Sequence, residues 1–217
     1  MIVLAPASVQ EMYDLTLLAF DLSDQYRNPA MILGDALLGQ MKEPLVRSRP
    51  GKVNVVPKPW ALTGAQGRDP LRIKSLYLKE GELSEHNWKL FQKYEEMKKE
   101  EIRFESFLAD DARLVLTAYG SVARISRTAV EMARNEGMEV GLFRPITLFP
   151  FPKKQVREIG MKSKGMLVVE MNAGQMIEDV QLSVGCTVKI EHFGRFGGII
   201  PSPDEVVRAL EQKVIGG

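Results

Sequence analysis

The most constraining feature of the sequence is an alternation of short apolar runs with amphipathic segments between residue 113 and the end of the chain. Apolar runs at 114–118, 140–143, 166–170 and 187–190 are each followed by a segment with helical spacing. Such alternation is typical of β-α units, whose strands lie parallel while helices cover both faces of the sheet. We therefore expect an α/β domain with a doubly wound parallel sheet over residues 111–217.

The helices of this domain carry explicit boundary signals. The helix after the first strand should end at Gly137 and the helix after the third strand at Gly185, because glycine suits the left-handed conformation at a helix end. Ser202 is the expected N-cap of the last helix. Pro203 suits the first helical position, and Glu205 completes a capping box.

A smaller strand, helix, strand pattern opens the chain. Residues 2–5 and 30–34 are the expected parallel strands, and Ser8 with Glu11 matches a capping box at the start of the helix between them. About 45 residues cannot bury both faces of such a sheet. We expect residues 1–47 to be part of a domain whose other strands are missing. Either two copies self-associate through the bare sheet, which the local helix signals favour, or this segment is partly disordered.

A connector separates the two patterns. Residues 48–70 are rich in proline and glycine, which interrupt regular structure. Residues 85–107 are dense in lysine and glutamate around an apolar stripe, which predicts an amphipathic helix. We assign residues 48–110 to a linker with this helix.

Composition excludes several classes of function. Lys and Arg total 29 against 28 Asp and Glu, so no net field attracts nucleic acid or an anionic membrane. Cys186 is the single cysteine, which excludes an internal disulfide and any iron-sulfur cluster held by thiolates of this chain. No apolar run approaches the length of a bilayer span or a signal core, so a cytoplasmic location is expected.

No catalytic or metal motif stands out. The stretch after the first strand of the α/β domain contains only Gly120, whereas a dinucleotide fold needs a glycine-rich loop there; Gly120 and Ser121 are better explained as a turn and a helix cap. His86 and His192 lack the companions of a metal site. Ser121 and Ser202 suit helix caps better than nucleophiles, since no base is paired with them.

Five polar residues are expected at the carboxyl edge of the sheet, where open α/β folds assemble their sites. These are Arg144, Glu170, Asn172, Gln175 and Arg195. Four of them also have a purely structural explanation: Asn172 could cap a helix, Glu170 could pair with a base, Arg144 could form a salt bridge at a strand end, and Arg195 could belong to a tight connection. We expect this edge to meet another subunit or coenzyme A.

Several motifs together resemble one family, the alpha subunits of 2-oxoacid:ferredoxin oxidoreductases, and within it the type that acts on 3-methyl-2-oxobutanoate (2-ketoisovalerate). The resemblance spans essentially the whole chain. The motifs that carry it are APASVQEMYD (residues 5–14), AF (19–20), YRNP (26–29), GDALLGQM (34–41), EHNWK (85–89), RPITLFP (144–150), VEMNAGQM (169–176) and GRFGG (194–198).

The resemblance implies a reaction for the assembled enzyme. Members of the family use thiamine diphosphate and magnesium to decarboxylate a 2-oxoacid, pass electrons through iron-sulfur clusters to ferredoxin, and transfer the acyl group to coenzyme A. The implied partners are the beta subunit and the gamma and delta subunits. A branched-chain 2-oxoacid is the preferred substrate, with 2-oxoglutarate as the neighbouring possibility.

The resemblance also implies that this chain is a supporting piece. Residues 1–47 match only the last strands and helix of the family's pyrimidine-binding domain, without the glutamate that activates the cofactor, and residues 111–217 match the following transketolase-C-like domain. In the family the partner subunit normally carries the diphosphate and magnesium motif, Gly-Asp-Gly followed by asparagines, and this chain has only Gly34-Asp35-Ala36. We expect the isolated chain to be inactive and to bind none of the cofactors alone. The alternative is a binding or assembly module with no direct part in catalysis.

Overall fold

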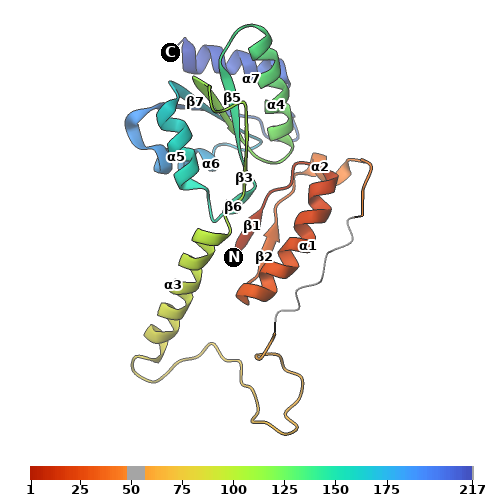
Figure 1. Ribbon diagram of the computed structural model, residues 1–217, viewed down its shortest axis with the longest axis vertical. Coiled ribbons are helices and arrows are strands. Elements are labelled where there is room, and N and C mark those ends of the chain that lie inside the picture. Colours follow the sequence, from red (N-terminus) through yellow and green to blue (C-terminus); the bar gives the residue numbers. More distant parts are fainter. Residues whose placement is uncertain (48–56, 217) are drawn as a thin grey trace.

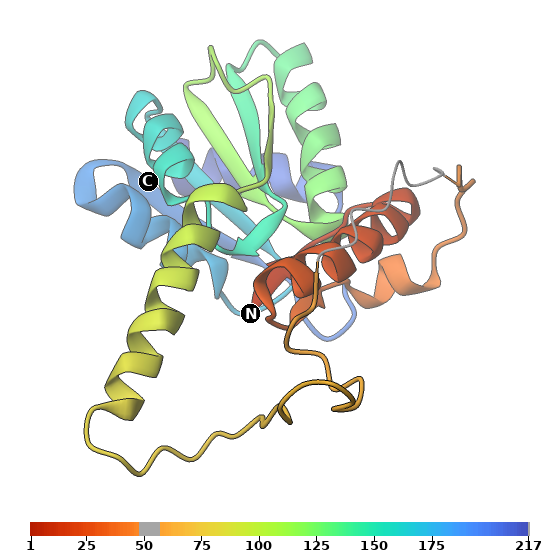
Figure 2. The ribbon, with the colours of Figure 1, turned by 60° about the horizontal axis from the view of Figure 1, so that its bottom comes forward.

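The computed structural model describes residues 1–47 and 57–216 (Figures 1 and 2). The larger of its two sheets has five strands in the order β3-β5-β4-β7-β8. Its strands are β3 (Phe104–Phe107), β4 (Leu114–Ala118), β5 (Val140–Pro145), β7 (Gly165–Glu170) and β8 (Lys189–Gly194). β5, β4, β7 and β8 are parallel, whereas β3 pairs antiparallel with β5 at one edge. The expected doubly wound α/β fold is confirmed.

Helices cover both faces of this sheet, because neighbouring strand residues point to opposite sides. Leu116 and Leu167 face the first core, beneath α4 (Gly120–Asn135) and α7 (Pro203–Leu210). Val115 and Val168 face the second core, which lies beneath α5 (Lys153–Lys162) and α6 (Met176–Val184). All four of these side chains are buried.

The boundary signals of the α/β domain hold. The Ser202 hydroxyl accepts from the Glu205 N–H at 3.2 Å while the Ser202 N–H donates to the Glu205 carboxylate at 2.9 Å, which is the expected capping box. α7 continues as the π-helical turn η2 (Glu211–Ile215). The strand expected at 187–190 begins later, at Lys189, because the 3-10 turn η1 (Gly185–Thr187) follows α6 first.

The smaller sheet has the order β2-β1-β6. β1 (Ile2–Leu4) and β2 (Ala30–Ile32) are parallel and joined by α1 (Val9–Tyr26), as expected, and the Ser8 hydroxyl caps α1 by accepting from the Glu11 N–H. The third strand, β6 (Thr147–Phe149), comes from the α/β domain and pairs antiparallel with β1. The expectation that β1 lacks a further neighbour in this chain is therefore wrong, because a strand more than 140 residues later in the sequence covers that edge of β1. β2 remains at the other edge of the sheet.

The helix expected over residues 85–107 is observed as α3 (Glu82–Glu100), and its expected end is wrong. The last residues of the expected helix instead form β3, where exposed and half-buried side chains alternate with the period of a strand. Only the C-terminal part of α3 packs on the small sheet, through the buried Met97 and through Glu101, which accepts a hydrogen bond from the Tyr26 hydroxyl at 2.7 Å. The N-terminal half of α3 projects away from the body (Figures 1 and 2).

A short helix, α2 (Ala36–Gln40), follows β2. It is the last helix or strand in the first described range, residues 1–47. The connector expected over residues 48–70 lies partly outside the described residues, and its described part from residue 57 contains turns and bends but no helix or strand before α3. Among the residues that the structure describes, no helix has the length and apolar character needed to cross a membrane.

Candidate functional site

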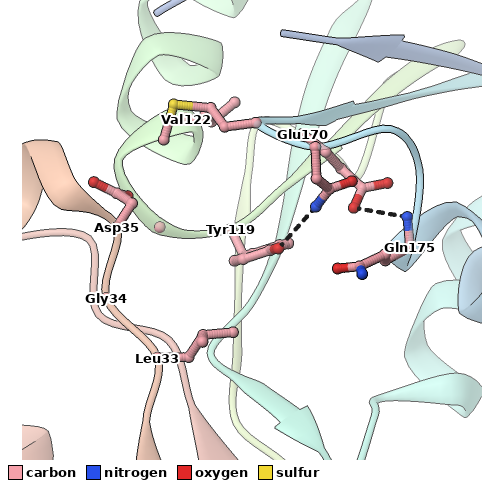
Figure 3. Close-up of a pocket in the computed structure, with 10 residues that line it drawn as sticks. Leu33, Gly34, Asp35, Tyr119, Val122, Glu170 and Gln175 are labelled. Atoms are coloured by element: carbon pink, nitrogen blue, oxygen red, sulfur yellow. Dashed lines mark hydrogen bonds between the residues drawn. The ribbon is translucent and has the colours of Figure 1, made fainter. Parts of the chain in front are cut away.

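The two sheets meet at a pocket of about 210 Å³, which we call the junction pocket (Figure 3). Its lining comes from the loop after β2, the turn from β4 into α4, and the turn from β7 into α6. The lining residues are Leu33, Gly34, Asp35, Tyr119, Gly120, Val122, Glu170, Met171, Asn172 and Gln175. β4 and β7 are adjacent parallel strands, so their carboxyl ends bring Tyr119 and Glu170 to the same edge of the sheet.

Asp35 binds the small sheet to the larger one at this pocket. Its carboxylate caps α2 by accepting from the Leu38 N–H at 2.9 Å, and also accepts from the Ser121 N–H at 2.9 Å at the start of α4. Gly120 has a φ of +65°, and a β-carbon there would lie 3.0 Å from the Asp35 carboxylate, so glycine permits this approach. The positive end of α4 is thus neutralised by a carboxylate of the same chain.

The expectation that Ser121 caps α4 through its hydroxyl is wrong. The Ser121 hydroxyl is buried and forms no hydrogen bond with the described residues, and the N-cap position belongs to Tyr119. Asp35, from 86 residues earlier, takes over the capping role. The sequence contains a signal for only half of this arrangement, since an aspartate before Ala36-Leu37-Leu38 is a good N-cap for α2.

Glu170 is the carboxylate that organises the start of α6. It is 1% exposed and accepts from the N–H groups of Gln175 at 3.3 Å, Met176 at 2.9 Å and Ile177 at 3.1 Å. The Nε2 atom of His192 lies 3.7 Å from its Oε1, so the expected basic neighbour is a histidine. Glu170, and not Asn172, satisfies the free N–H groups of α6, because it is the side chain that ends β7 directly below the helix start.

Asn172 instead joins two turns. Its Oδ1 accepts from the Gly174 N–H at 2.8 Å and its Nδ2 donates to the Tyr119 hydroxyl at 3.3 Å. Burial raises the pKa of Tyr119, and the nearby Glu170 charge raises it further, against a lowering by the Asn172 hydrogen bond. Tyr119 is therefore a neutral phenol at physiological pH, with its proton available to a ligand. Figure 3 shows the amide end of Gln175 directed toward that hydroxyl across the pocket.

Arg144 lies elsewhere, in a group of ion pairs that we call the arginine network. Its buried guanidinium donates to both carboxylate oxygens of Glu11, to Glu105 at 3.0 Å and to the Ala5 carbonyl at 3.5 Å. Burial raises the pKa of Glu11, but the hydrogen bonds from Arg144 and the Ala7 N–H outweigh it and leave this pKa below its ordinary value. The network connects the start of α1 with β3 and β5 of the larger sheet.

Two further arginines on α4 extend the arginine network. Arg127 pairs with Glu105 at 2.8 Å, and Arg124 pairs at 2.6 Å with Glu43, which in turn accepts from the Val9 N–H at 2.8 Å. Arg144 was expected at a strand end, but the identity of its partners was not, because Glu11 is 133 residues away and Glu105 was assigned to a helix.

Arg195 is also held within the chain. It donates to Glu205 of the α7 capping box at 2.9 Å, and its guanidinium lies 4.8 Å from the centre of the Phe193 ring. The structure thus brings Glu170, Asn172 and Gln175 together at the junction pocket, while Arg144 and Arg195 lie in separate contacts outside its lining.

The junction pocket offers hydrogen bonds and little charge. Its two carboxylates, Asp35 and Glu170, are engaged by backbone N–H groups, and its lining contains no lysine or arginine. Over residues 1–47 and 57–216 no group of three or more His, Cys, Asp or Glu side chains is placed to hold a metal ion. The pocket suits a small polar ligand or a partner's side chain that hydrogen-bonds to Tyr119 and Gln175.

Two protein-family models match the chain consecutively. Residues 1–102 match "Pyruvate flavodoxin/ferredoxin oxidoreductase, thiamine diP-bdg", and residues 112–206 match "Pyruvate:ferredoxin oxidoreductase core domain II". The boundary between the two matches lies in the segment that contains β3, between α3 and β4.

Curated relatives resemble the chain over nearly its full length. It is 43% identical over 210 residues to "Ketoisovalerate oxidoreductase subunit VorB" of Methanothermobacter thermautotrophicus, an alignment that covers 97% of this chain and 59% of that protein. It is 31% identical over 238 residues to "2-oxoglutarate synthase subunit KorA" of Methanothermobacter marburgensis, covering 96% and 63%. The chain therefore spans about 60% of the length of these relatives.

Solved structures share the fold. The "2-oxoglutarate:ferredoxin oxidoreductase from Magnetococcus marinus with 2-oxoglutarate, coenzyme A and succinyl-CoA bound" superposes with a TM-score of 0.77 at 18% identity, covering 98% of this chain and 42% of that chain. A "Split gene transketolase, inactive beta4 tetramer" superposes with a TM-score of 0.55 at 13% identity, covering 99% and 57%. The transketolase-like character expected from the sequence agrees with both.

Proposed function

The chain belongs to the family of 2-oxoacid:ferredoxin oxidoreductases, and from this premise we propose that it is part of the subunit carrying the pyrimidine-binding domain, the alpha subunit. The assembled enzyme would oxidatively decarboxylate a 2-oxoacid, form an acyl-coenzyme A and reduce ferredoxin. The observation that carries the proposal is the consecutive match of two domains of one enzyme family over residues 1–102 and 112–206.

We propose a branched-chain 2-oxoacid, 2-ketoisovalerate, as the substrate. Identity to the ketoisovalerate oxidoreductase subunit is 43%, against 31% for the 2-oxoglutarate synthase subunit over a similar share of the chain. This difference favours the branched-chain acid, with 2-oxoglutarate as the alternative to be compared in the same assay.

The residues of the junction pocket do not fit thiamine diphosphate. A magnesium-bound diphosphate needs oxygen ligands for the metal and donors or cations for the phosphates. The Asp35 carboxylate already accepts the hydrogen bond from the N–H group at the start of α4. The second carboxylate, Glu170, accepts hydrogen bonds from N–H groups at the start of α6. We therefore assign thiamine diphosphate, magnesium and the iron-sulfur clusters to other parts of the assembled enzyme, and the single described cysteine, Cys186, is an exposed free thiol.

The part played by this chain is to hold two domains in a fixed relation. The arginine network, the Asp35 cap and the pairing of β1 with β6 all connect the region matched by the first family model to the region matched by the second. Because a misplacement of about 1 Å in an active site can cost a hundredfold in rate, such contacts support catalysis without touching the substrate.

Reconstitution tests this function. The chain alone, mixed with magnesium and thiamine diphosphate, is expected to bind no cofactor in calorimetry and to reduce no viologen dye with any 2-oxoacid. Adding the segment that corresponds to the remainder of the alpha subunit, together with the beta, gamma and delta subunits, should restore dye reduction that depends on coenzyme A. The rate should be higher with 2-ketoisovalerate than with 2-oxoglutarate.

Two results would contradict the proposal. Micromolar binding of thiamine diphosphate by the isolated chain would require a site that the junction pocket does not explain. Full activity of the other subunits without this chain would favour the alternative, a binding or assembly module without a part in catalysis.

Self-association belongs to the same proposal. The outer edge of β2 has no neighbour among the described strands, and the projecting half of α3 exposes Leu83, Trp88 and Phe91 at 50%, 62% and 52%. Exposed strand edges and apolar clusters of this kind favour association in water. Sedimentation velocity should show a concentration-dependent shift above a monomer for the chain alone, and the shift should disappear when the partner subunits are added.

A further inference from the structure

A second concave surface lies on the opposite side of α3 from α1, between the C-terminal end of α3 and the start of α5. In both ribbon views these two helix ends lie beside each other (Figures 1 and 2). We call this surface the lysine groove. Its volume is about 720 Å³, and it is lined by Lys98, Lys99, Ile102, Leu148, Phe149, Pro150, Phe151, Lys153, Lys154, Gln155 and Asp179.

The charge of the lysine groove is strongly positive. Four lysines face a single carboxylate, Asp179. Lys98 pairs with Glu95 at 2.7 Å and Lys154 approaches Glu158 at 3.9 Å, both on their own helices, whereas Lys99 and Lys153 form no ion pair or hydrogen bond with any described residue. A chain whose net charge is only +1 thus places four lysines around one groove, where the Asp179 carboxylate attracts Lys153.

Helix electrostatics does not explain the two lysines on α5. Lys98 and Lys99 complement the negative end of α3, but Lys153 and Lys154 lie in the first turn of α5, where the helix dipole is already positive. α5 has no side-chain cap, and the N–H groups of Lys154 and Gln155 donate to no acceptor among the described residues. An anion bound there would accept from these N–H groups and would offset the unfavourable placement of the two lysines.

The floor of the lysine groove is apolar. Leu148 and Phe149 of the β6 segment are partly exposed beside the buried Pro150 and Phe151, and Phe149 packs edge-on against Tyr94 with ring centres 6.3 Å apart. An inorganic anion does not contact such an apolar surface favourably, whereas a ligand with a flat aromatic ring binds more tightly by covering it. The volume lies within the range of about 300–1,000 Å³ found for small-molecule sites.

We propose that the lysine groove binds a nucleoside phosphate. The phosphates lie against the N-terminus of α5 between Lys153, Lys154 and the lysines of α3, and the base covers Phe149, with Gln155 and Asp179 in reach of its polar edge. This site is separate from the junction pocket and does not depend on the function proposed above.

Isothermal titration of the full 217-residue chain with ADP at low salt tests the proposal. ADP should bind, with an affinity that falls as salt is raised. Pyrophosphate should bind at least about 10-fold more weakly than ADP, because it leaves the apolar floor uncovered, and adenosine should bind more weakly still, because it leaves the lysines unpaired.

Matched lysine variants test whether ADP binds at the start of α5. The double variant K153Q/K154Q should weaken ADP binding by about 10-fold or more, while K162Q, which removes a lysine from the last turn of the same helix, should leave it unchanged. Without ligand, K153Q/K154Q should unfold at the same or a higher temperature than the unchanged chain, since it removes positive charge from a helix N-terminus. Weakening without loss of stability separates a binding role from a structural one.

Photocrosslinking gives an independent readout. An azido derivative of ADP should label the peptide that contains Phe149 and Phe151, and unlabelled ADP should prevent this. The proposal is overturned if ADP shows no binding at about 1 mM, if pyrophosphate binds as tightly as ADP, or if K153Q/K154Q binds ADP as tightly as K162Q.

Discussion

The two sheets of this protein differ in which parts of the sequence supply their strands and core side chains. The five-stranded sheet draws its strands and both of its cores from the continuous stretch between Phe104 and Val214. The three-stranded sheet takes two strands from the first 32 residues, a third from Thr147–Phe149, and a core side chain, Met97, from α3. The larger sheet is built to stand alone, whereas the smaller one is assembled on it.

This difference teaches which contacts carry the architecture. The small sheet is held by few groups that are distant in sequence, namely the β1-β6 ladder, the arginine network, Asp35 and the Tyr26–Glu101 hydrogen bond. Contacts of this type form late and open early, because ordering the long intervening chain costs entropy. Each of the following predictions compares the two sheets.

The largest effect is expected for Leu167→Ala in the centre of the five-stranded sheet, where Leu167 is fully buried. Removing a buried leucine side chain should lower the free energy of unfolding by about 3 kcal/mol. Amide exchange should accelerate in both sheets, because the small sheet rests on the large one. Leu182→Ala on α6, where the side chain is 75% exposed, is the control and should change the free energy by less than about 0.5 kcal/mol.

Leu4→Ala makes the same chemical change in the small sheet, where Leu4 is also fully buried. We expect a local loss of about 2 kcal/mol, seen as faster amide exchange in β1, β2 and β6. Protection in β4 and β7 should stay as it was. Equally faster amide exchange in both sheets would show that the chain unfolds as one unit and would contradict the proposed difference between the two sheets.

Arg144→Met should separate the small sheet from the large one. Arg144 is buried and Glu11 is a third exposed, so we expect about 2 kcal/mol, less than for a fully buried ion pair. The ion pair also gives a pH dependence. The folded pKa of Glu11 lies below its ordinary value of 4.5, so its stabilisation is present above that pH and is lost as the pH falls through the lowered folded value.

Denaturant unfolding at several pH values measures both effects. Arg144→Met should remove the part of the acid destabilisation that arises from Glu11, and Glu11→Gln should do the same. An unchanged acid limb in both variants would mean that other carboxylates carry it.

Tyr26→Phe tests the contact between α1 and α3. The Tyr26 hydroxyl donates a hydrogen bond to the buried Glu101 carboxylate, and without this hydroxyl Glu101 retains Arg103 as its side-chain donor. We expect the substitution to lower the free energy of unfolding by about 1.5 kcal/mol. Burial and the Glu101 carboxylate raise the pKa of Tyr26, so this stabilisation is present below the ordinary value of 10.0 and is lost as the pH rises through the raised value. Tyr13→Phe on the same helix is the control and should have no measurable effect.

Ser202→Ala should produce the smallest effect and should act on the large sheet alone. Loss of the capping box at α7 should cost about 1 kcal/mol. Ser121→Ala is the matched comparison, because this buried hydroxyl has no hydrogen-bond partner among the described residues, and it should cost nothing or slightly stabilise the fold. Thermal unfolding compares the two. A larger cost at Ser121 than at Ser202 would overturn the assignment of the α4 cap to Asp35.

Much of the larger sheet could be predicted because its signals are local. Each of β4, β5 and β7 is a continuous apolar run between helices with spaced apolar residues, and Gly137, Gly185 and Ser202 mark helix ends within a few residues of the elements they terminate. β3 and β6 were missed because they are short strands with mixed polarity, and each gains its strand character only from pairing with β5 or β1.

The candidate site was predictable in part for the same reason. Glu170, Asn172 and Gln175 follow a recognisable strand, so their position at the edge of the sheet could be read from the sequence. The roles of these side chains could not, because Glu170 serves the N–H groups of the following helix and Asn172 binds Tyr119 of another turn. Arg144 was placed at the correct strand end without its partners.

The sequence by itself determined the α/β alternation, the parallel direction of the local strands, the N-caps of α1 and α7, and the membership of a family through motifs that extend along the chain. The tertiary structure alone decided that β6 completes the first sheet, that Asp35 caps α4, and that Glu11 and Glu105 neutralise Arg144. Periodicity and capping depend on residues three or four positions apart. Pairing between residues separated by 86 or 133 positions depends instead on which buried polar groups need partners once the chain has folded.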